Sequence, residues 1–436
     1  MKLTRAPSIV AMIFLVGCWG HLPTRTPAQQ ADDSAGALKA LQGSQFAEAS
    51  SQATVALKRD PQNARAAGVR AIATYQQAGE QLVKDLEMLA SNGDVAKVLD
   101  HEEGRAMWQR FADQLALVDA DLAVVAADPG FSLELCLACW EHDWNHNGRV
   151  DDRDRKLFEI EYDPHCPKQA AYAPMPVEDG DGNLQPVEPP CTDEIPDGDV
   201  RRRPTFRFDV GDADWGRAMI SFQRAVVELI LAYRWNELDL LLKGKIDKPK
   251  IVLHLGDARR AIRARELIVA GLGFSARSRD EYLAETDDDH EWLPNPMQKH
   301  HPIPMPMDAA VYDTWKNVIG DLQRMLASEE GLSIRALASL IDRKAPLFVP
   351  DAYVDLGAML RSPRDITLDF GLELESGNPM TVRPAIEQML KNVLGNGYQT
   401  KMRPSPIVER IEKMKHELDH GDETFERKLR YLFWVN

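Results

Sequence analysis

The amino-acid sequence predicts a mainly helical protein, with a helical N-terminal region, a helical C-terminal domain and a small β element. Apolar residues recur every three or four positions along several long segments, which is typical of helices that bury one face. Strict alternation of apolar and polar residues, which indicates a half-buried strand, stands out at 366–375. A segment rich in proline and cysteine separates the two helical parts.

The start of the chain has the pattern of an export signal. Lys2 and Arg5 precede the apolar run IVAMIFLV at 9–16, which is too short to span a bilayer as a mature helix. The run leads into LVGC at 15–18. This order resembles the signal of bacterial lipoproteins, and the resemblance implies removal of residues 1–17 and lipidation of Cys18. An ordinary signal peptide with a chance cysteine is the alternative.

The residue after the lipidated cysteine bears on location. It is Trp19 and not aspartate, so the resemblance implies an anchor in the outer membrane of the cell envelope. No other stretch approaches 18 unbroken apolar residues, so we expect an anchored protein that does not span the membrane. Residues 18–32 are polar and are expected to form a tether.

The charge of the chain favours cationic partners. It carries 52 basic and 68 acidic residues, a formal net charge of −16, and loss of Lys2 and Arg5 makes the mature chain more acidic. Such a surface repels nucleic acid, so no nucleic-acid partner is expected. Divalent metals and cationic ligands are the more natural partners.

The region 33–130 is expected to be helical. In GSQFAEASSQATVALKRDPQNARA (43–66), Phe46, Ala49, Ala56 and Pro61 are spaced as in the second helix of a tetratricopeptide repeat, which this stretch resembles. Arrays of this family need three or more units, and the following residues depart from the pattern. The resemblance therefore implies a single helical hairpin, available to a protein or peptide partner. A longer apolar stripe follows at Met107, Phe111, Leu115, Val118, Leu122 and Val125.

The domain at 207–436 is expected to be mainly helical with a small sheet. KIVLHL (250–255) and FRFDV (206–210) are candidate partners for the strand at 366–375, and Arg201 to Arg203 are expected to form an exposed basic run. The helical stripes are Trp215, Met219, Phe222, Val226, Leu229 and Tyr233; Val311, Trp315, Ile319, Leu322 and Met325; and Val408, Ile411, Met414 and Leu418.

The segment 131–206 holds the cysteines that remain after removal of the signal. Cys136, Cys139, Cys166 and Cys191 are even in number, and an oxidising compartment favours two disulfides. Three pairings are open. We expect these bonds to hold one local region together.

Within this segment, DWNHNGRVDDRD (143–154) places oxygen-bearing side chains at alternate positions around Gly148. Calcium prefers six to eight oxygen ligands, and EF-hand loops supply them from positions 1, 3, 5, 7, 9 and 12, with glycine at 6. The stretch resembles the EF-hand family, most closely its dockerin variety. The resemblance implies a helix before the loop from Phe131, a helix after it over RKLFEI (155–160), and bound calcium. The implied ligands are Asp143, Asn145, Asn147, the Arg149 carbonyl, Asp151 through water, and Asp154.

Other interpretations of this segment stay open. A non-binding turn rich in Asp and Asn would have the same composition. Zinc would use cysteine and histidine, but an oxidising compartment disfavours thiolate ligands. The zinc candidates are Cys136, Cys139, His142, His146 and Cys166. A redox role for the Cys136–Cys139 pair lacks the surrounding βαβ pattern.

A second acidic segment, 285–301, offers carboxylates with imidazoles. Such groups build catalytic metal centres, although a solvated acidic loop is the simpler interpretation. The sequence thus predicts a structural or interaction lipoprotein with a calcium loop and no identifiable catalytic site. The alternative is a metal-dependent envelope hydrolase that uses the segment 287–301. Its candidate residues are Asp287, Asp288, Asp289, His290, Glu291, His300 and His301.

Overall fold

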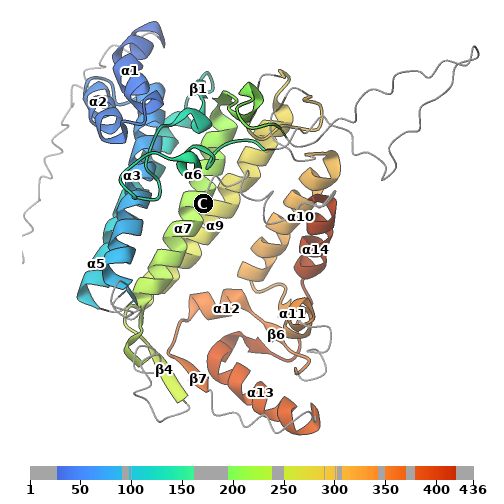
Figure 1. Ribbon diagram of the computed structural model, residues 1–436. Helices are drawn as coiled ribbons and strands as arrows, with labels where there is room; N and C mark the ends of the chain where they lie inside the picture. Colours follow the sequence, from blue (N-terminus) through green and yellow to red (C-terminus); the bar gives the residue numbers. More distant parts are fainter. Residues whose placement is uncertain are drawn as a thin grey trace, which may run out of the picture.

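The computed structural model describes residues 27–90, 98–99, 101–161, 195–237, 250–288, 290–299, 301, 307–341, 349–369 and 379–418. Within these residues the protein is mainly helical, as the sequence predicts, with a few small antiparallel sheets. Figure 1 shows the long helices α3, α5, α7 and α9 running side by side, with the small sheets near their ends. The predicted signal, Cys18 and most of the tether lie outside the described residues.

The N-terminal helices are α1 (Pro27–Gln42), α2 (Phe46–Arg59), α3 (Ala64–Ala90) and α5 (Glu102–Val125). α2 packs against α1 and α3, and α3 packs against α5. The face of α2 that carries Ala49, Ala53 and Ala56 is buried, because small side chains let neighbouring helices approach closely. The helix ends directly before Asp60 and Pro61, as its sequence predicts.

The helices α7 (Val210–Ala232) and α9 (Ala258–Ala284) form the most extensive helix pair. A Cβ atom on Gly271 would lie 2.7 Å from the Phe222 ring, so this close approach needs glycine. Asp209 begins α7 with a capping box: its carboxylate accepts from the Gly211 N–H at 2.7 Å, while the Asp212 carboxylate accepts from the Asp209 N–H at 2.9 Å.

The C-terminal helices continue the layer. α10 (Ala309–Leu326) packs against α9 and α14 (Ile407–Leu418), and the Asp308 side chain accepts from the Val311 N–H at the start of α10. Shorter helices complete the described fold: α6 (Asp152–Arg155), α11 (Ile334–Ile341), α12 (Leu356–Arg361) and α13 (Pro379–Leu394), with 3₁₀ turns at Leu137–Cys139, Val200–Arg202 and Gly395–Gly397.

The strands pair in three groups. β4 (Lys250–Leu255) pairs antiparallel with β7 (Ile366–Asp369) and with β3 (Tyr233–Arg234), which confirms the predicted pairing of 250–255 with the alternating segment. The other candidate partner was wrong. β2 (Phe206–Phe208) pairs instead with β1 (Leu133–Leu135), in a different sheet from β7. A third sheet joins β5 (Leu332–Ser333), β6 (Tyr353–Val354) and β8 (Tyr398–Gln399).

Two apolar centres position the segments described below. One lies between α2, α3 and residues 131–158. The other gathers at the start of α7 around Phe206, Trp215, Tyr282, Trp292 and Tyr312. Among the described helices, none has both the length and the apolar character that a bilayer span requires.

Candidate functional site

The loop at 143–154 connects elements that differ from those of an EF-hand. β1 and a 3₁₀ turn at Leu137–Cys139 precede it, so the expected entering helix from Phe131 was wrong. The helix expected over 155–160 was also wrong: the short helix α6 covers Asp152–Arg155, and the chain turns at 156–158. The cause of the first difference is tertiary: Leu133 and Leu135 bury their side chains in the first apolar centre and pair with β2.

The first half of the loop nevertheless has an organised set of Asx turns. The Asp143 carboxylate accepts from the N–H groups of Asn147 at 3.0 Å and Gly148 at 2.7 Å. The side-chain oxygen of Asn145 accepts from the Asn147 N–H, and that of Asn147 accepts from the Arg149 N–H, both at 3.1 Å. Gly148 has φ of +87°, a conformation that glycine adopts without strain.

The second half of the loop is closed by Asp154. One of its oxygens accepts from the N–H groups of Trp144 and Asn145, at 3.0 and 3.2 Å, and the other accepts from the Asp151 N–H at 2.8 Å. Asp154 is 2% exposed, so these bonds replace its hydration. The carboxylate therefore draws both ends of the loop together.

Asp151 stands out electrostatically. A hydrogen bond from the Asn147 side chain, followed by one from the Arg153 N–H, lowers the pKa of the Asp151 carboxyl. These hydrogen bonds favour the ionised form of the carboxyl. A charged oxygen at this loop position suits a hard cation.

Trp144, between the first two predicted ligands, packs into an aromatic group. Its ring lies 4.5 Å from His142, 5.4 Å from Phe158 and 5.8 Å from Phe46, measured between centroids. Phe46 belongs to α2, and Nε2 of His142 lies 2.6 Å from Oε1 of Glu80 on α3. The loop is therefore seated on the N-terminal helices.

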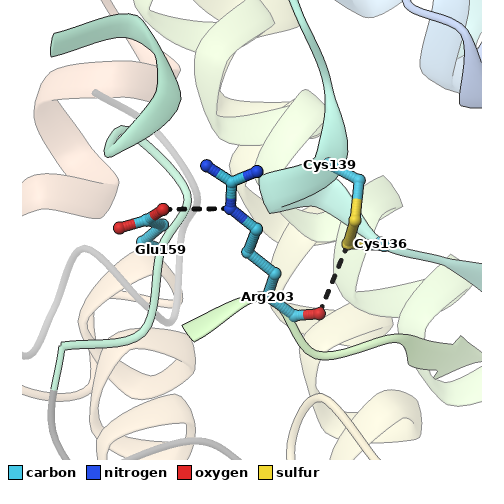
Figure 2. The surroundings of a disulfide bond; sticks show 4 residues. All are labelled: Cys136, Cys139, Glu159 and Arg203. Carbon is cyan, nitrogen blue, oxygen red and sulfur yellow. Dashed lines mark hydrogen bonds and ion pairs between the residues drawn. A yellow bond between two sulfur atoms is a disulfide. The ribbon is translucent and has the colours of Figure 1, made fainter. Parts of the chain in front are cut away.

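A disulfide joins Cys136 and Cys139 just before the loop. Figure 2 shows the Cys136 sulfur near the Arg203 carbonyl oxygen, at 3.5 Å, and the Arg203 guanidinium donating to Glu159 at 3.0 Å. Because these two sulfur atoms are joined in a disulfide, they are not available as thiolate ligands for zinc. Cys166 and Cys191, the other predicted disulfide cysteines, lie outside the described residues.

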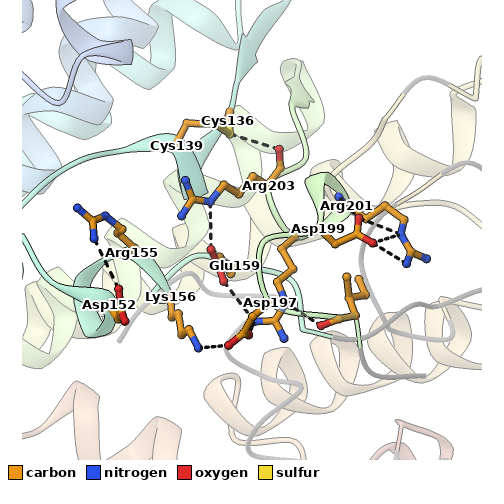
Figure 3. Close-up of polar contacts among 12 residues, drawn as sticks. Cys136, Cys139, Asp152, Arg155, Lys156, Glu159, Asp197, Asp199, Arg201 and Arg203 are labelled. Atoms are coloured by element: carbon orange, nitrogen blue, oxygen red, sulfur yellow. Dashed lines mark hydrogen bonds and ion pairs between the residues drawn. A yellow bond between two sulfur atoms is a disulfide. The ribbon is translucent and has the colours of Figure 1, made fainter. Parts of the chain in front are cut away.

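The expectation of an exposed run at Arg201 to Arg203 was wrong for its central residue. Arg202 is 5% exposed, and its guanidinium contacts Asp197 at 2.6 Å and Glu159 at 3.3 Å. Figure 3 shows how this network ties 152–159 to 197–203. The two ion pairs offset the desolvation free energy of burying one arginine. The sequence alone does not show that these acidic partners lie near Arg202.

A separate acidic group lies at the start of α7. Side-chain oxygens of Asp209, Glu285 and Glu291 all come within 4.8 Å of one another. Asp209 caps α7, and Glu285 directly follows the end of α9. The backbone of Glu291 pairs with that of Arg207 in an isolated parallel β-bridge. Gln298 donates to Glu285 at 3.2 Å. Three distant segments thus bring three carboxyl groups into one place.

Crowding and burial oppose ionisation of this group. Burial, then the charges of Asp209 and Glu291, raises the pKa of Glu285 to about 10. Burial, then Asp209, also raises the pKa of Asp212 well above its usual range. Burial, then Asp214, raises the pKa of Glu281 to about 7. These carboxyl groups either retain protons or are stabilised by a cation.

The predicted cluster at 287–301 is only partly brought together. Glu291 joins the three-carboxyl group, whereas Asp287 binds Arg207 at 2.8 Å and Asp288 accepts from the Lys299 N–H at 2.8 Å. His290 and His301 are not members of the group, and Asp289 and His300 lie outside the described residues.

Sequence reasoning missed Asp209 and Glu285. The pair Asp209 and Asp212, three residues apart before an apolar stripe, is a helix-start signal. That signal predicts a cap but contains no information on which distant acids approach it. Comparisons of the chain with protein-family models, with curated proteins and with solved structures find no match.

Proposed function

We propose that this chain is a lipid-anchored cell-envelope protein of structural or interaction type whose loop at 143–154 binds calcium. The observation that carries the proposal is the set of Asx turns around Gly148, with side-chain oxygens from alternate residues. EF-hand loops use these positions for their ligands. The anchor rests on the LVGC signal at 15–18 alone.

The donor set fits calcium better than zinc or magnesium. It consists of hard oxygens on a short loop, and the nearby cysteines are in a disulfide. Bound calcium would neutralise the acids that the loop collects. The residues that would hold it are Asp143, Asn145, Asn147, the Arg149 carbonyl, Asp151 through water, and Asp154. With three carboxylates we expect a weak site, with Kd around 10⁻⁴ M.

The packing of the loop against α2 indicates which surface calcium binding would stabilise. Trp144 lies between the first two ligand positions and contacts Phe46 of α2. Ordering the loop would therefore fix the surface at which residues 140–158 meet the N-terminal helical hairpin. A protein or peptide partner that binds this hairpin would then bind a calcium-stabilised form.

The test is calorimetric calcium titration of the purified full chain, together with its melting temperature in EDTA and in millimolar calcium. We expect calcium to raise the melting temperature and magnesium to do much less, because magnesium sheds water reluctantly. Asp143→Ala should abolish the rise.

Asp152→Ala is the matched control, since Asp152 is in the same loop, is 88% exposed and occupies no ligand position. It should respond as the wild type does. An equal calcium response in wild type and Asp143→Ala would refute the loop as the site and direct attention to Asp209, Glu285 and Glu291.

A second candidate, a metal-dependent hydrolase, is supported by the three-carboxyl group alone. A hydrolase panel run with several divalent metals tests it. Metal-dependent turnover that Glu285→Gln removes, and the exposed-site variant Asp152→Ala retains, would favour the enzyme. Turnover unaffected by Glu285→Gln would exclude this centre.

A further inference from the structure

A cavity of about 200 Å³ lies where α3, α5 and α7 meet the strands β1 and β2. Its wall includes Trp140, Trp215, Trp292 and Phe208, and the two acids Asp209 and Asp212. Tyr75 of α3 is also in the wall and is only partly buried. The cavity is separate from the loop at 143–154.

The charged side chains in the cavity wall are all acidic. Among the described residues that line the cavity, the charged ones are Asp209 and Asp212, and none is lysine, arginine or histidine. The remainder is largely aliphatic and aromatic. Aromatic faces attract cations through the ring quadrupole, and cages of such rings recognise alkylated ammonium groups.

Several carboxyl groups lie close together at the acidic end of the cavity. Asp212 is 6% exposed, and its two oxygens accept from Tyr282 and from the Asp209 N–H, at 2.8 and 2.9 Å. Oxygens of Glu285 and Glu291 lie within 4.8 Å of an Asp209 oxygen. A cation at Asp209 would lie among these carboxyl oxygens and would reduce the repulsion between them.

We propose that this cavity binds a small organic cation, an ammonium group on an apolar body, with the ammonium at Asp209 and the apolar body between the aromatic walls. A compact metal ion would leave the apolar volume unfilled. A neutral apolar ligand would make no use of the acids, and an anion would be repelled by them.

The volume sets the size of the ligand. A cavity of about 150 Å³ with apolar walls holds benzene. The present cavity is somewhat larger, so a single ring with a short aminoalkyl arm fits. A suitable probe is 2-phenylethylammonium. Its neutral isostere 2-phenylethanol and the anion 3-phenylpropanoate have nearly the same shape and differ in charge.

The experiment is calorimetric titration of the full chain with these three probes, in EDTA so that divalent ions at the loop or the carboxyl group contribute nothing. We expect the ammonium to bind at least about tenfold more tightly than the alcohol, and the anion least. Asp209→Asn should raise the Kd of the ammonium about tenfold and leave that of the alcohol nearly unchanged.

The control variants separate charge from fold. Asparagine is as good a helix cap as aspartate, so Asp209→Asn keeps the start of α7. Asp257→Asn makes the same change at the cap of α9, outside the cavity wall, and should bind all three probes as the wild type does.

Two further variants test the cavity itself. Ala71→Leu fills the cavity from α3, and Met219→Trp fills it from a half-buried position on α7. Either variant, once folded by circular dichroism, should bind neither ammonium nor alcohol.

Three results would overturn the proposal: equal affinity for ammonium and alcohol, tighter binding of the anion, or no binding of any probe to the folded wild type. Retention of ammonium selectivity in Asp209→Asn would equally reject the assigned site. None of these outcomes depends on the calcium titration, so the two proposals fail separately.

Discussion

His142 Nε2 lies 2.6 Å from Glu80 Oε1, which ties the residue preceding the loop at 143–154 to the helix α3. The two side chains are 23% and 18% exposed, so the contact is partly shielded from water. It becomes an ion pair when the imidazole is protonated. Together with the Trp144–Phe46 contact, it makes the loop part of the N-terminal helical core.

This contact predicts an energetic coupling. In a double-mutant cycle of His142→Ala and Glu80→Ala, we expect a coupling free energy of about 1 kcal/mol, favourable to folding. Urea unfolding of the wild type, the two single variants and the double variant measures this coupling. Strictly additive effects would show that the loop and α3 are independent at this point.

The packing of α2 gives a second prediction. Ala53 is 0% exposed against neighbouring helices, so Ala53→Leu should lower the free energy of unfolding by about 1–3 kcal/mol through overpacking. Val55, on the same helix, is 47% exposed, and Val55→Leu should change it by less than about 0.5 kcal/mol. Similar effects at the two positions would contradict the assigned face of α2.

Glu281, near the end of α9, predicts a pH dependence. Burial and Asp214 raise the pKa of Glu281 to about 7 from an ordinary value of 4.5. Between these values the folded state binds more protons than the unfolded state, so this residue's contribution to stability is lost as the pH rises from about 4.5 to about 7. Glu281→Gln should therefore stabilise the protein at pH 8 relative to pH 5, by on the order of 1 kcal/mol after screening by solvent.

The comparison is made by urea unfolding at pH 5 and pH 8. Asp313→Asn removes an exposed carboxylate on α10 and serves as the control, with a pH profile like that of the wild type. If Glu281→Gln leaves the pH dependence of the free energy of unfolding unchanged, the pKa of Glu281 is not raised in the folded protein.

The signal sequence predicts membrane attachment through one residue. Cys18→Ala should move the protein from the membrane fraction to the soluble envelope extract, because the proposed lipid would be attached through this one sulfur. Trp19→Ala leaves the LVGC motif intact and should stay with the membrane. Normal fractionation of Cys18→Ala, with an unmodified N-terminal mass in the wild type, would disprove lipidation.

The helical class and the approximate positions of α5, α7, α10 and α14 follow from the sequence alone, whereas α9 was not predicted. Apolar spacing of three and four residues, together with caps such as Asp308 and stops such as Pro61, is local information, and local information is enough to begin and end a helix. The alternating segment at 366–375 was likewise recognisable as a strand: its described part, 366–369, is a strand, and the partner at 250–255 was among the candidates. The oxygen spacing around Gly148 also predicts the Asx turns of the loop, because each turn spans only two or three residues.

The tertiary structure decided which elements and side chains pair with one another. β2 pairs with β1 and not with β7, and Arg202 is buried between Glu159 and Asp197, because packing selects among partners that local patterns leave equivalent. The same holds for the replacement of an entering helix by β1 and for the meeting of Asp209, Glu285 and Glu291. Such contacts join segments tens of residues apart, and their free energy depends on burial and on neighbouring charges, neither of which is encoded in the spacing of nearby residues.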